Sequence, residues 1–493
     1  MIDAINNAND FLNNILFGVP MIIFILGTGL YLTIRLGFIQ ITKIKDIWNN
    51  TIKKMFKNLK EESDVVSKND SILTAESTFN QMLSNIKDFK QGKEIDEIWF
   101  AVYNWYMQND EWKPKLKEAI KGFSHKNDAE KITEENIKRL YGNTLKTSVS
   151  RLEQYRECPF SFHLKYGLKL KEREEFVVRP IDTGSFMHEV IDEFFENTRN
   201  IKTIEDQEIK EIVNNIIDEK LSLSKNYIFT STPRFAVLTN ILKKAILQSI
   251  TYIVQQMKNS DFEIAGNEIE FNRKIDNVEI TGKIDRIDTA QNEQGKYIRI
   301  IDYKSSDRSI NLNELEAGTQ IQLLTYLDTA VEKTKNIPVG MLYFNLIDPV
   351  IKASRNLTDE QIQEELKKQF RMSGMVLADV NIIRMMDKNL QTGASSTIPV
   401  TLDKNGDIMD SRSNAITKEQ FTLLQNKVKK IIKQIAKEIL EGNIEIKPTY
   451  NKGKKEEACK YCEYKSICCF NPNVNNYSFI DNKSKKELLD NLQ

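Results

Sequence analysis

Residues 267–306 constrain the fold of this chain most strongly, because apolar and polar residues alternate along them in two runs. Alternation with a period of two is typical of β-strands that bury one face. The polar residues 292–295, Asn-Glu-Gln-Gly, separate the two runs and predict a hairpin turn. We therefore expect an antiparallel strand pair that turns between residues 292 and 295.

Three charged residues of this hairpin can meet in one site. Asp302 and Lys304 lie two apart, so their side chains project from the same face of the second strand, and Asp285 lies on the first. Carboxylates bind Mg²⁺ or Mn²⁺ through oxygen, and a nearby cation stabilises the charge that develops when a phosphodiester is hydrolysed. Asp-x-Lys alone is a weak signal, since 28% of the residues are charged.

Several flanking segments predict helices. Residues 147–174 predict an N-capped helix that meets Pro159 and a second short helix that ends at Gly167. Gly184 leads into a helix that carries His188, and residues 416–440 predict a long amphipathic helix that stops at Gly442. Strands and helices together predict an α/β fold.

The N-terminal region differs from the rest. Residues 15–34 contain no charged residue over 20 positions, enough for a helix to cross a bilayer core of about 30 Å. Six basic residues follow between 35 and 57, which would place the remainder in the cytoplasm, anchored to the membrane by this helix. The run GTGLYLTIRLGFIQ at 27–40 resembles the opening of sodium:alanine symporters. Hydropathy after about residue 57 is that of a soluble protein, so we expect a symporter-like fragment over 1–57 and no transport.

Residues 58–145 are polar and predict mainly helices. In the run from 94 to 112, Ile98, Trp99, Val102, Trp105 and Tyr106 recur at spacings near three and four, which favours a helix with an apolar core face. The alternative is that aromatic residues of this run, together with Tyr103 and Trp112, stack on single-stranded bases. The chain has no G-x-x-x-x-G-K-[ST] motif, so ATP hydrolysis is not expected.

Charge and cysteine content narrow the ligand classes. Seventy Lys and Arg balance 70 Asp and Glu, so a DNA-binding surface has to be a local patch. Of five cysteines, three have the spacing Cys459-x₂-Cys462-x₅-Cys468 and need a fourth donor. Zinc is the usual ion for such a set, and Cys158, Cys469 or His163 could complete it.

Four ordered motifs resemble the motif series of RecB-family nucleases: G-S-F-M-H at 184–188, G-K-I-D-R-I-D at 282–288, I-I-D-Y-K-S at 300–305 and Q-L-L-T-Y at 322–326. The resemblance implies a PD-(D/E)xK restriction-endonuclease-like core, a mixed central sheet flanked by helices, over residues 146–475, with a polar tail over 476–493. It implies that the helix histidine and two aspartates bind Mg²⁺ or Mn²⁺, that the lysine assists the nucleophile, and that a Gln and a Tyr support the site and the DNA backbone. These residues are His188, Asp285, Asp302, Lys304, Gln322 and Tyr326. We expect Asp288 to be a solvated hairpin charge.

Residues 60–480, including TSVSRLEQYRECPF and CEYKSIC, resemble the C-terminal part of the B subunit of AddAB-type helicase-nucleases. The resemblance implies a 4Fe-4S cluster held by Cys158, Cys459, Cys462 and Cys468, and residues 58–145 as a helicase-like remnant. It implies an exonuclease that cuts the 5′-ended strand in double-strand break repair, with DNA and an A subunit as partners. Because the family's long N-terminal helicase-like region is missing, docking to the A subunit is in question. Alternatives are a stand-alone exonuclease related to CRISPR-associated nucleases, and a non-catalytic, membrane-tethered DNA-binding fragment.

Overall fold

The computed structural model of the chain describes residues 74–90, 94–123, 127–173, 175–349, 351, 358–472 and 474–490, together with Thr28 and Arg35. It divides into two compact units, residues 1–124 and 125–493. The predicted membrane helix at 15–34 lies outside the described residues except for Thr28. Within the described parts, no helix is both long and apolar enough to traverse a lipid bilayer.

The first unit contains three described helices, α6 (Ala75–Lys90), α7 (Ile98–Gln108) and α8 (Lys113–Phe123). Phe79, Met82, Tyr106 and Leu116 form its buried core, and the ring centroids of Phe79 and Tyr106 lie 5.2 Å apart. The predicted helix over the aromatic run is confirmed, and Trp99 and Val102 pack on this core. Ile98 and Trp105 are instead 59% and 52% exposed, so the predicted apolar face is only partly buried.

The second unit is built on a mixed sheet of seven strands in the order β1-β3-β4-β5-β6-β9, with β2 paired to β3. Pairs β2–β3, β3–β4 and β5–β6 are antiparallel, and pairs β1–β3, β4–β5 and β6–β9 are parallel. The expected mixed α/β fold is therefore confirmed. The strand bounds are β1 (Leu145–Thr147), β2 (Glu263–Ile275), β3 (Val278–Asn292), β4 (Gly295–Lys304), β5 (Ile337–Asn345), β6 (Ser373–Leu377) and β9 (Ala415–Ile416).

The predicted hairpin is formed by β3 and β4. Its ladder runs from Asn292↔Gly295 to Arg286↔Ile301, so Glu293 and Gln294 form the turn. The Asn292 side chain accepts hydrogen bonds from the Gln294 backbone N–H at 2.8 Å and from the Tyr297 hydroxyl at 2.8 Å. These bonds fix the turn locally, as short polar side chains do in tight connections. The alternation of apolar residues that indicated the strand pair is seen as alternating burial along β3.

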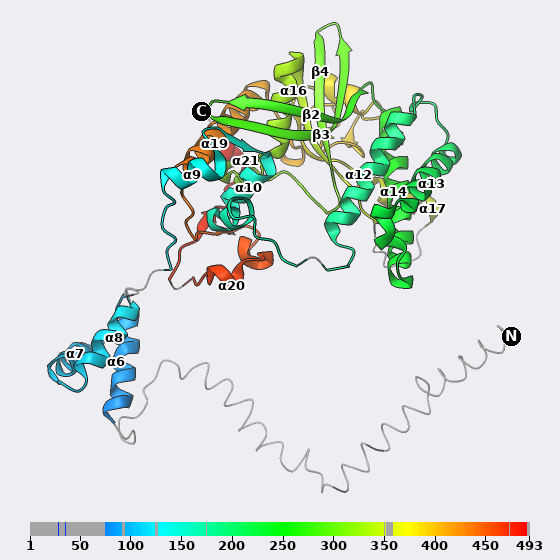
Figure 1. Cartoon of the computed structure of the whole chain (residues 1–493). Helices are drawn as coiled ribbons and strands as arrows, with labels where there is room; N and C mark the ends of the chain where they lie inside the picture. The colour runs from blue at the N-terminus through cyan, green and yellow to red at the C-terminus, as the bar shows by residue number, and fades with distance from the viewer. Residues whose placement is uncertain are drawn as a thin grey trace. The chain divides into compact units, whose positions relative to one another are not determined.

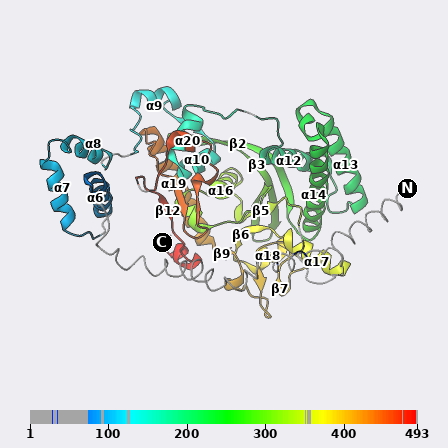
Figure 2. The same ribbon diagram turned by 90° about the horizontal axis from the view of Figure 1, so that it is seen from below.

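Helices cover both sides of the sheet (Figures 1 and 2). Figure 2 shows α12 (Pro180–Asn197), α13 (Asp206–Ser222) and α14 (Pro233–Lys258) on one side, and α10 (Val149–Glu157), α16 (Gln322–Thr334) and α19 (Lys418–Leu440) on the other. The predicted C-terminal amphipathic helix is α19, capped by the Thr417 side chain and Gln420. The predicted helix before Cys158 is α10, with the Ser148 hydroxyl as its N-cap. Helix α12 begins at Pro180, four residues before the expected Gly184.

The remaining elements lie around this core. They are α9 (Glu134–Tyr141), α11 (Pro159–Phe162), the π-helical turn η2 (His163–Gly167), α15 (Leu312–Ala317), α17 (Asp359–Gln369), α18 (Val380–Met386), α20 (Lys465–Cys468) and α21 (Lys485–Asp490), the 3₁₀ helices η3 (Ser224–Thr230), η4 (Asp410–Arg412) and η5 (Ala458–Tyr461), and strands β7 (Gly393–Ala394), β8 (Thr401–Leu402), β10 (Thr449–Asn451), β11 (Glu456–Glu457) and β12 (Ser478–Ile480). Strands β10, β11 and β12 form a separate small sheet.

The structure groups two further segments with the second unit. The compact units divide at 124/125, and α9 and β1 pack with the core of the second unit, while the domain limits expected from the sequence stay predictions. The expected polar tail contributes β12 to the small sheet and buries Leu488 and Leu489 against Leu312, Leu315 and Leu424. Two leucines in a lysine-rich run are a weak apolar signal, and their burial becomes visible only when α21 packs on α15.

Candidate active site

The site is placed where β3 and β4 separate. Strand β3 pairs with β1 at residues 278–280 and with β4 from residue 286 onward, so the segment between them has no neighbour on that edge. Asp285 lies in this gap, and its Oδ2 accepts a hydrogen bond of 2.8 Å from the Tyr303 backbone N–H. The Asp285 carboxylate therefore lies between the two diverging strands.

Asp302 and Lys304 lie at the end of β4, and Gln322 of α16 joins them. The Lys304 ammonium lies 2.5 Å from Asp302 Oδ2. The Gln322 amide donates to Asp302 Oδ1 at 3.0 Å, and its carbonyl oxygen accepts from Lys304 at 3.3 Å. The same amide nitrogen lies 3.1 Å from the Tyr326 hydroxyl, one helical turn further along α16. The structure therefore brings these four predicted residues into one hydrogen-bonded group.

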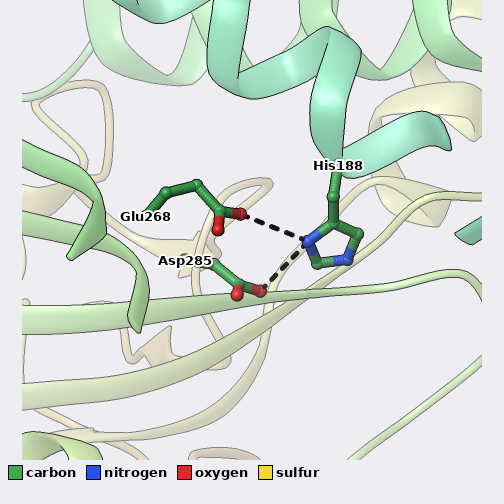
Figure 3. A group of neighbouring side chains, drawn as sticks. All are labelled: His188, Glu268 and Asp285. Carbon is green, nitrogen blue, oxygen red and sulfur yellow. Dashed lines mark ion pairs between the residues drawn. The ribbon is translucent and has the colours of Figure 1, made fainter. Parts of the chain in front are cut away.

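His188 reaches the site from α12. Its Nε2 lies 3.1 Å from the Tyr303 carbonyl oxygen, which can only accept, so the proton sits on Nε2 when the ring is neutral. Its Nδ1 then presents a lone pair toward Asp285 Oδ2 at 3.6 Å and Glu268 Oε1 at 3.7 Å. Figure 3 shows the two carboxylates converging on this nitrogen. A carbonyl that fixes the tautomer in this way is typical of metal-binding histidines.

Glu268 is the residue that the sequence analysis missed. Single ligand atoms of His188, Glu268 and Asp285 all lie within 4.8 Å of one another, the one such group of three among the described residues. Asp302, expected in the metal set, is not part of that group. Glu268 lies on β2 with a φ of 49°, a left-handed conformation that is uncommon for a non-glycine residue and that breaks the regular side-chain alternation. In a regular strand, Glu268 and Glu270 would lie two apart on the same face, so the sequence does not distinguish Glu268 from Glu270.

The electrostatics of the group fit a divalent cation. Burial, followed by the charge of Asp302, raises the pKa of Asp285 to about 7, and burial also raises the pKa of Asp302. Burial would lower the pKa of His188, but the Glu268 and Asp285 carboxylates outweigh it and raise that pKa. Burial and mutual repulsion oppose the ionisation of these neighbouring carboxylates, and a bound cation would offset both effects.

A cavity of about 520 Å³ opens onto these side chains. Its wall includes the N-terminal turn of α12, where Gly184 approaches Ser305 so closely that an added Cβ would lie 3.3 Å from the hydroxyl. Lys283, Glu189 and Asp192 also line it, and Lys283 pairs with Glu268 at 2.5 Å. The cavity gives a polar substrate access to Asp285, Asp302 and Lys304.

The four predicted cluster cysteines line a second cavity, of about 380 Å³. Cys158 is the C-cap of α10, Cys468 ends α20, and Cys459 and Cys462 lie on the turn before it. Cys469 and His163, the other candidate donors, do not line this cavity. Burial, followed by the charge of Cys158, raises the pKa of Cys459 to about 12. Thiols in such surroundings ionise readily only with a bound cation.

Asp288 was expected to be solvated, and this prediction is wrong. The residue is 0% exposed and forms ion pairs with Arg286 at 2.6 Å and with Arg299 at 2.8 Å. Its side chain points to the opposite side of β3 from Asp285, against α14, where Met257 contacts Arg286. The sequence shows only a charged hairpin, because burial of this face depends on α14.

Comparisons with known proteins agree with this geometry. Residues 146–469 match the PD-(D/E)XK nuclease superfamily, residues 67–122 match the ATP-dependent helicase/deoxyribonuclease AddB fifth domain, and residues 2–79 match the sodium:alanine symporter family. Relatives named as the B subunit of an ATP-dependent helicase/deoxyribonuclease are 38% identical in Clostridium acetobutylicum, 36% in Clostridium novyi and 36% in a Thermoanaerobacter species.

These alignments cover 89%, 90% and 90% of this chain and 40%, 41% and 41% of the respective relatives, so the chain spans about two fifths of their length. The superfamily match covers the mixed sheet from residue 146 onward and every residue of the site described above. On this match, the chain belongs to the PD-(D/E)XK nuclease superfamily.

Proposed function

We propose that the second unit is a divalent-metal-dependent deoxyribonuclease that hydrolyses the phosphodiesters of one DNA strand. The observation that carries this proposal is the convergence of His188, Glu268 and Asp285 within 4.8 Å, beside an Asp302–Lys304 pair, on one cavity. Carboxylates, an imidazole and a lysine beside a phosphate-sized opening suit metal-assisted phosphodiester hydrolysis.

In this proposal His188, Asp285, Asp302 and the added Glu268 would hold Mg²⁺ or Mn²⁺. When bound, the ion would activate water and neutralise charge on the scissile phosphate. Lys304 stabilises the negative charge of the transition state, since its ammonium is held at the cavity by Asp302 and Gln322. Gln322 orients both of these side chains, and the Tyr326 hydroxyl supports Gln322 and the DNA backbone.

The test is Mg²⁺-dependent degradation of linear DNA by the full chain and by Asp302→Ala. Loss of a carboxylate at the site predicts a fall in rate on the order of 10²-fold or more. Asp218→Ala is the matched control, because this carboxylate is 66% exposed on α13 and pairs with Lys243 at the surface. Equal activity of Asp302→Ala and the wild type would refute the assignment.

A basic cavity beside the site suits a single strand. It measures about 690 Å³, and among the described residues six cations line it against three carboxylates: Arg151, Lys165, Lys169, Lys171, Arg173 and Arg179 against Glu172, Glu175 and Glu463. Arg179 immediately precedes Pro180 and Ile181, which line the catalytic cavity. Tyr166, with the Arg151 guanidinium 4.8 Å above its ring, adds an aromatic surface. Cations with an aromatic residue are the usual composition of a single-strand groove.

We also propose that the cysteine cavity holds a 4Fe-4S cluster. A zinc ion with Zn–S bonds of about 2.3 Å would bring the sulfur atoms to within roughly 3.8 Å of one another. Among the described residues, no three cysteine sulfur atoms lie within 4.8 Å of one another, which favours a larger group. Bound, the cluster would tie Cys158 to the C-terminal cysteines and hold the two ends of the domain together.

Iron content and broad absorbance near about 400 nm test the cluster. Cys468→Ser should lose both signals, and the neighbouring Cys469→Ser, whose thiol is outside the cavity, should keep them. A colourless, zinc-loaded wild type would contradict the proposal.

The wider role follows from the relatives. We propose that this nuclease is part of a helicase/deoxyribonuclease B subunit that acts with an A subunit on the 5′-ended strand during double-strand break repair, and the match of residues 67–122 supports this. Co-purification of the full chain with a clostridial A subunit tests the partnership. The cytoplasmic location and the membrane anchor at 15–34 stay predictions.

A further inference from the structure

Glu153 of α10 holds the first turn of α16 from outside that helix. Its Oε1 accepts hydrogen bonds from the backbone N–H groups of Ile321 at 2.6 Å and Gln322 at 2.8 Å. Ile321, the N-cap of α16, provides no side-chain cap of its own. The first amides of a helix have no partner within it, so a carboxylate at this position satisfies them and complements the helix dipole.

The amide held in this way belongs to the residue that organises the catalytic pair. Gln322 is the first residue of α16, and its side chain contacts both Asp302 and Lys304. Because the side chain and the backbone share one Cα, fixing the amide of Gln322 fixes the origin of both contacts. Glu153 itself contacts neither Asp302 nor Lys304 by any hydrogen bond or ion pair found among the described residues.

Helix α10 gives Glu153 a firm support. Arg156 pairs with Glu438 of α19 at 3.2 Å, and Leu152 and Tyr155 are buried in the core. The helix ends at Cys158, which lines the cysteine cavity. The charged groups facing Glu153 are Arg308 and Lys304, and burial, only partly offset by the two backbone hydrogen bonds, raises its pKa to about 7.

We propose that Glu153 is a positioning residue for the nuclease reaction, which acts through Gln322 by fixing the N-terminus of α16. The inference rests on the proposed nuclease function, since it assigns Gln322 its role at the Asp302–Lys304 pair. A rigid Gln322 keeps Lys304 directed at the cavity and affects the rate of the chemical step more than DNA binding.

Two variants of the full chain test this. Each is used with the metal content that it retains after purification. Glu153→Ala removes the acceptor, and Glu153→Gln keeps an oxygen of the same reach. Hydrogen exchange of the amides of Ile321 and Gln322, measured by mass spectrometry on peptides over 319–326, should be on the order of 10-fold faster in the alanine variant and near wild type in the glutamine variant.

The kinetic arm is a double-mutant cycle with Gln322→Ala. Glu153→Ala should lower kcat by about 10-fold with KM for linear DNA unchanged, and the double variant should be no slower than Gln322→Ala alone. Unchanged amide exchange, or losses that multiply in the double variant, would overturn the inference. If the wild type and all variants fail to cut DNA, the proposed function fails, while the exchange measurement still decides the role of Glu153.

Discussion

Replacing Asp288 with Asn should destabilise the second unit severely. The Asp288 carboxylate is fully buried and accepts from Arg286 Nε at 2.6 Å and Nη2 at 2.7 Å, and from Arg299 Nε at 2.9 Å. The two arginines are 3% and 1% exposed. Asn keeps the shape but removes the negative charge that both arginines share, and the described part of the chain places no other carboxylate in an ion pair with either of the two buried guanidinium ions.

The magnitude follows from this arrangement. Breaking a buried ion pair by removing one partner costs about 3–5 kcal/mol, and here one carboxylate compensates two cations, so we expect the upper part of that range. A domain of this kind has roughly 5–15 kcal/mol in total, so the loss is a large share. The damage should centre on the β3–β4 ladder, where Asp288 pairs with Arg299 and Arg286 pairs with Ile301, next to Asp285.

Native-state hydrogen exchange of peptides over 286–301 is the suitable assay, because a chain of two units does not unfold in one step. A loss of about 4 kcal/mol corresponds to exchange roughly 10³-fold faster in these strands. Asp276→Asn is the control. Asp276 lies on the β2–β3 turn with 65% of its side chain exposed, and it pairs with Lys433 of α19. A change of less than about tenfold in Asp288→Asn would refute the reasoning.

The pH dependence of this effect has a definite sign. Burial alone would raise the pKa of Asp288, but Arg286 and Arg299 outweigh it and hold that pKa below its ordinary value of 3.8. A carboxyl with a lowered pKa stabilises the fold above its unfolded-state pKa, and the stabilisation is lost as pH falls through the folded value. The difference in exchange between wild type and Asp288→Asn should therefore be full at neutral pH and shrink below about pH 4.

Three further outcomes can be checked. Lys304→Ala should reduce the cleavage rate by about 10²–10³-fold without weakening Mn²⁺ binding measured by electron paramagnetic resonance, and weaker Mn²⁺ binding would contradict its assigned role. Lys171→Glu should weaken single-stranded DNA binding at low salt and reduce the salt slope by about 0.7 for each phosphate that the protein no longer neutralises, with affinities converging at high salt. Gly374→Ala should cost about 3 kcal/mol of local stability, measured by native-state hydrogen exchange of peptides over β5 and β6, because its φ is 138° and a Cβ would lie 2.2 Å from the Met341 carbonyl oxygen. Gly393→Ala, with a φ of 81° but open space around it, should cost less.

Much of the site could be predicted, and the reason differs from residue to residue. Asp302 and Lys304 share a face because they lie two apart on one strand, and Asp285 is brought to them by a hairpin whose turn is only two residues long. Both relations are local. The positions of His188 and Gln322 came from a resemblance to known nucleases, and their chemical roles stay predictions. Glu268 was missed for two reasons. The alternating sequence pattern does not predict its left-handed backbone, and its contact with His188 joins residues that lie far apart in the sequence.

The sequence by itself determined the strands of the hairpin, the N-cap of α10, the end of α19 before Gly442, and the set of cysteines with ligand-like spacing, since periodicity, capping and spacing depend on neighbours in the chain. The tertiary structure alone decided that Glu268 joins His188, that Asp288 is buried between two arginines, and that Glu153 caps α16. These relations join segments far apart in sequence. They depend on which faces pack and which charges lose water, and no local pattern encodes that.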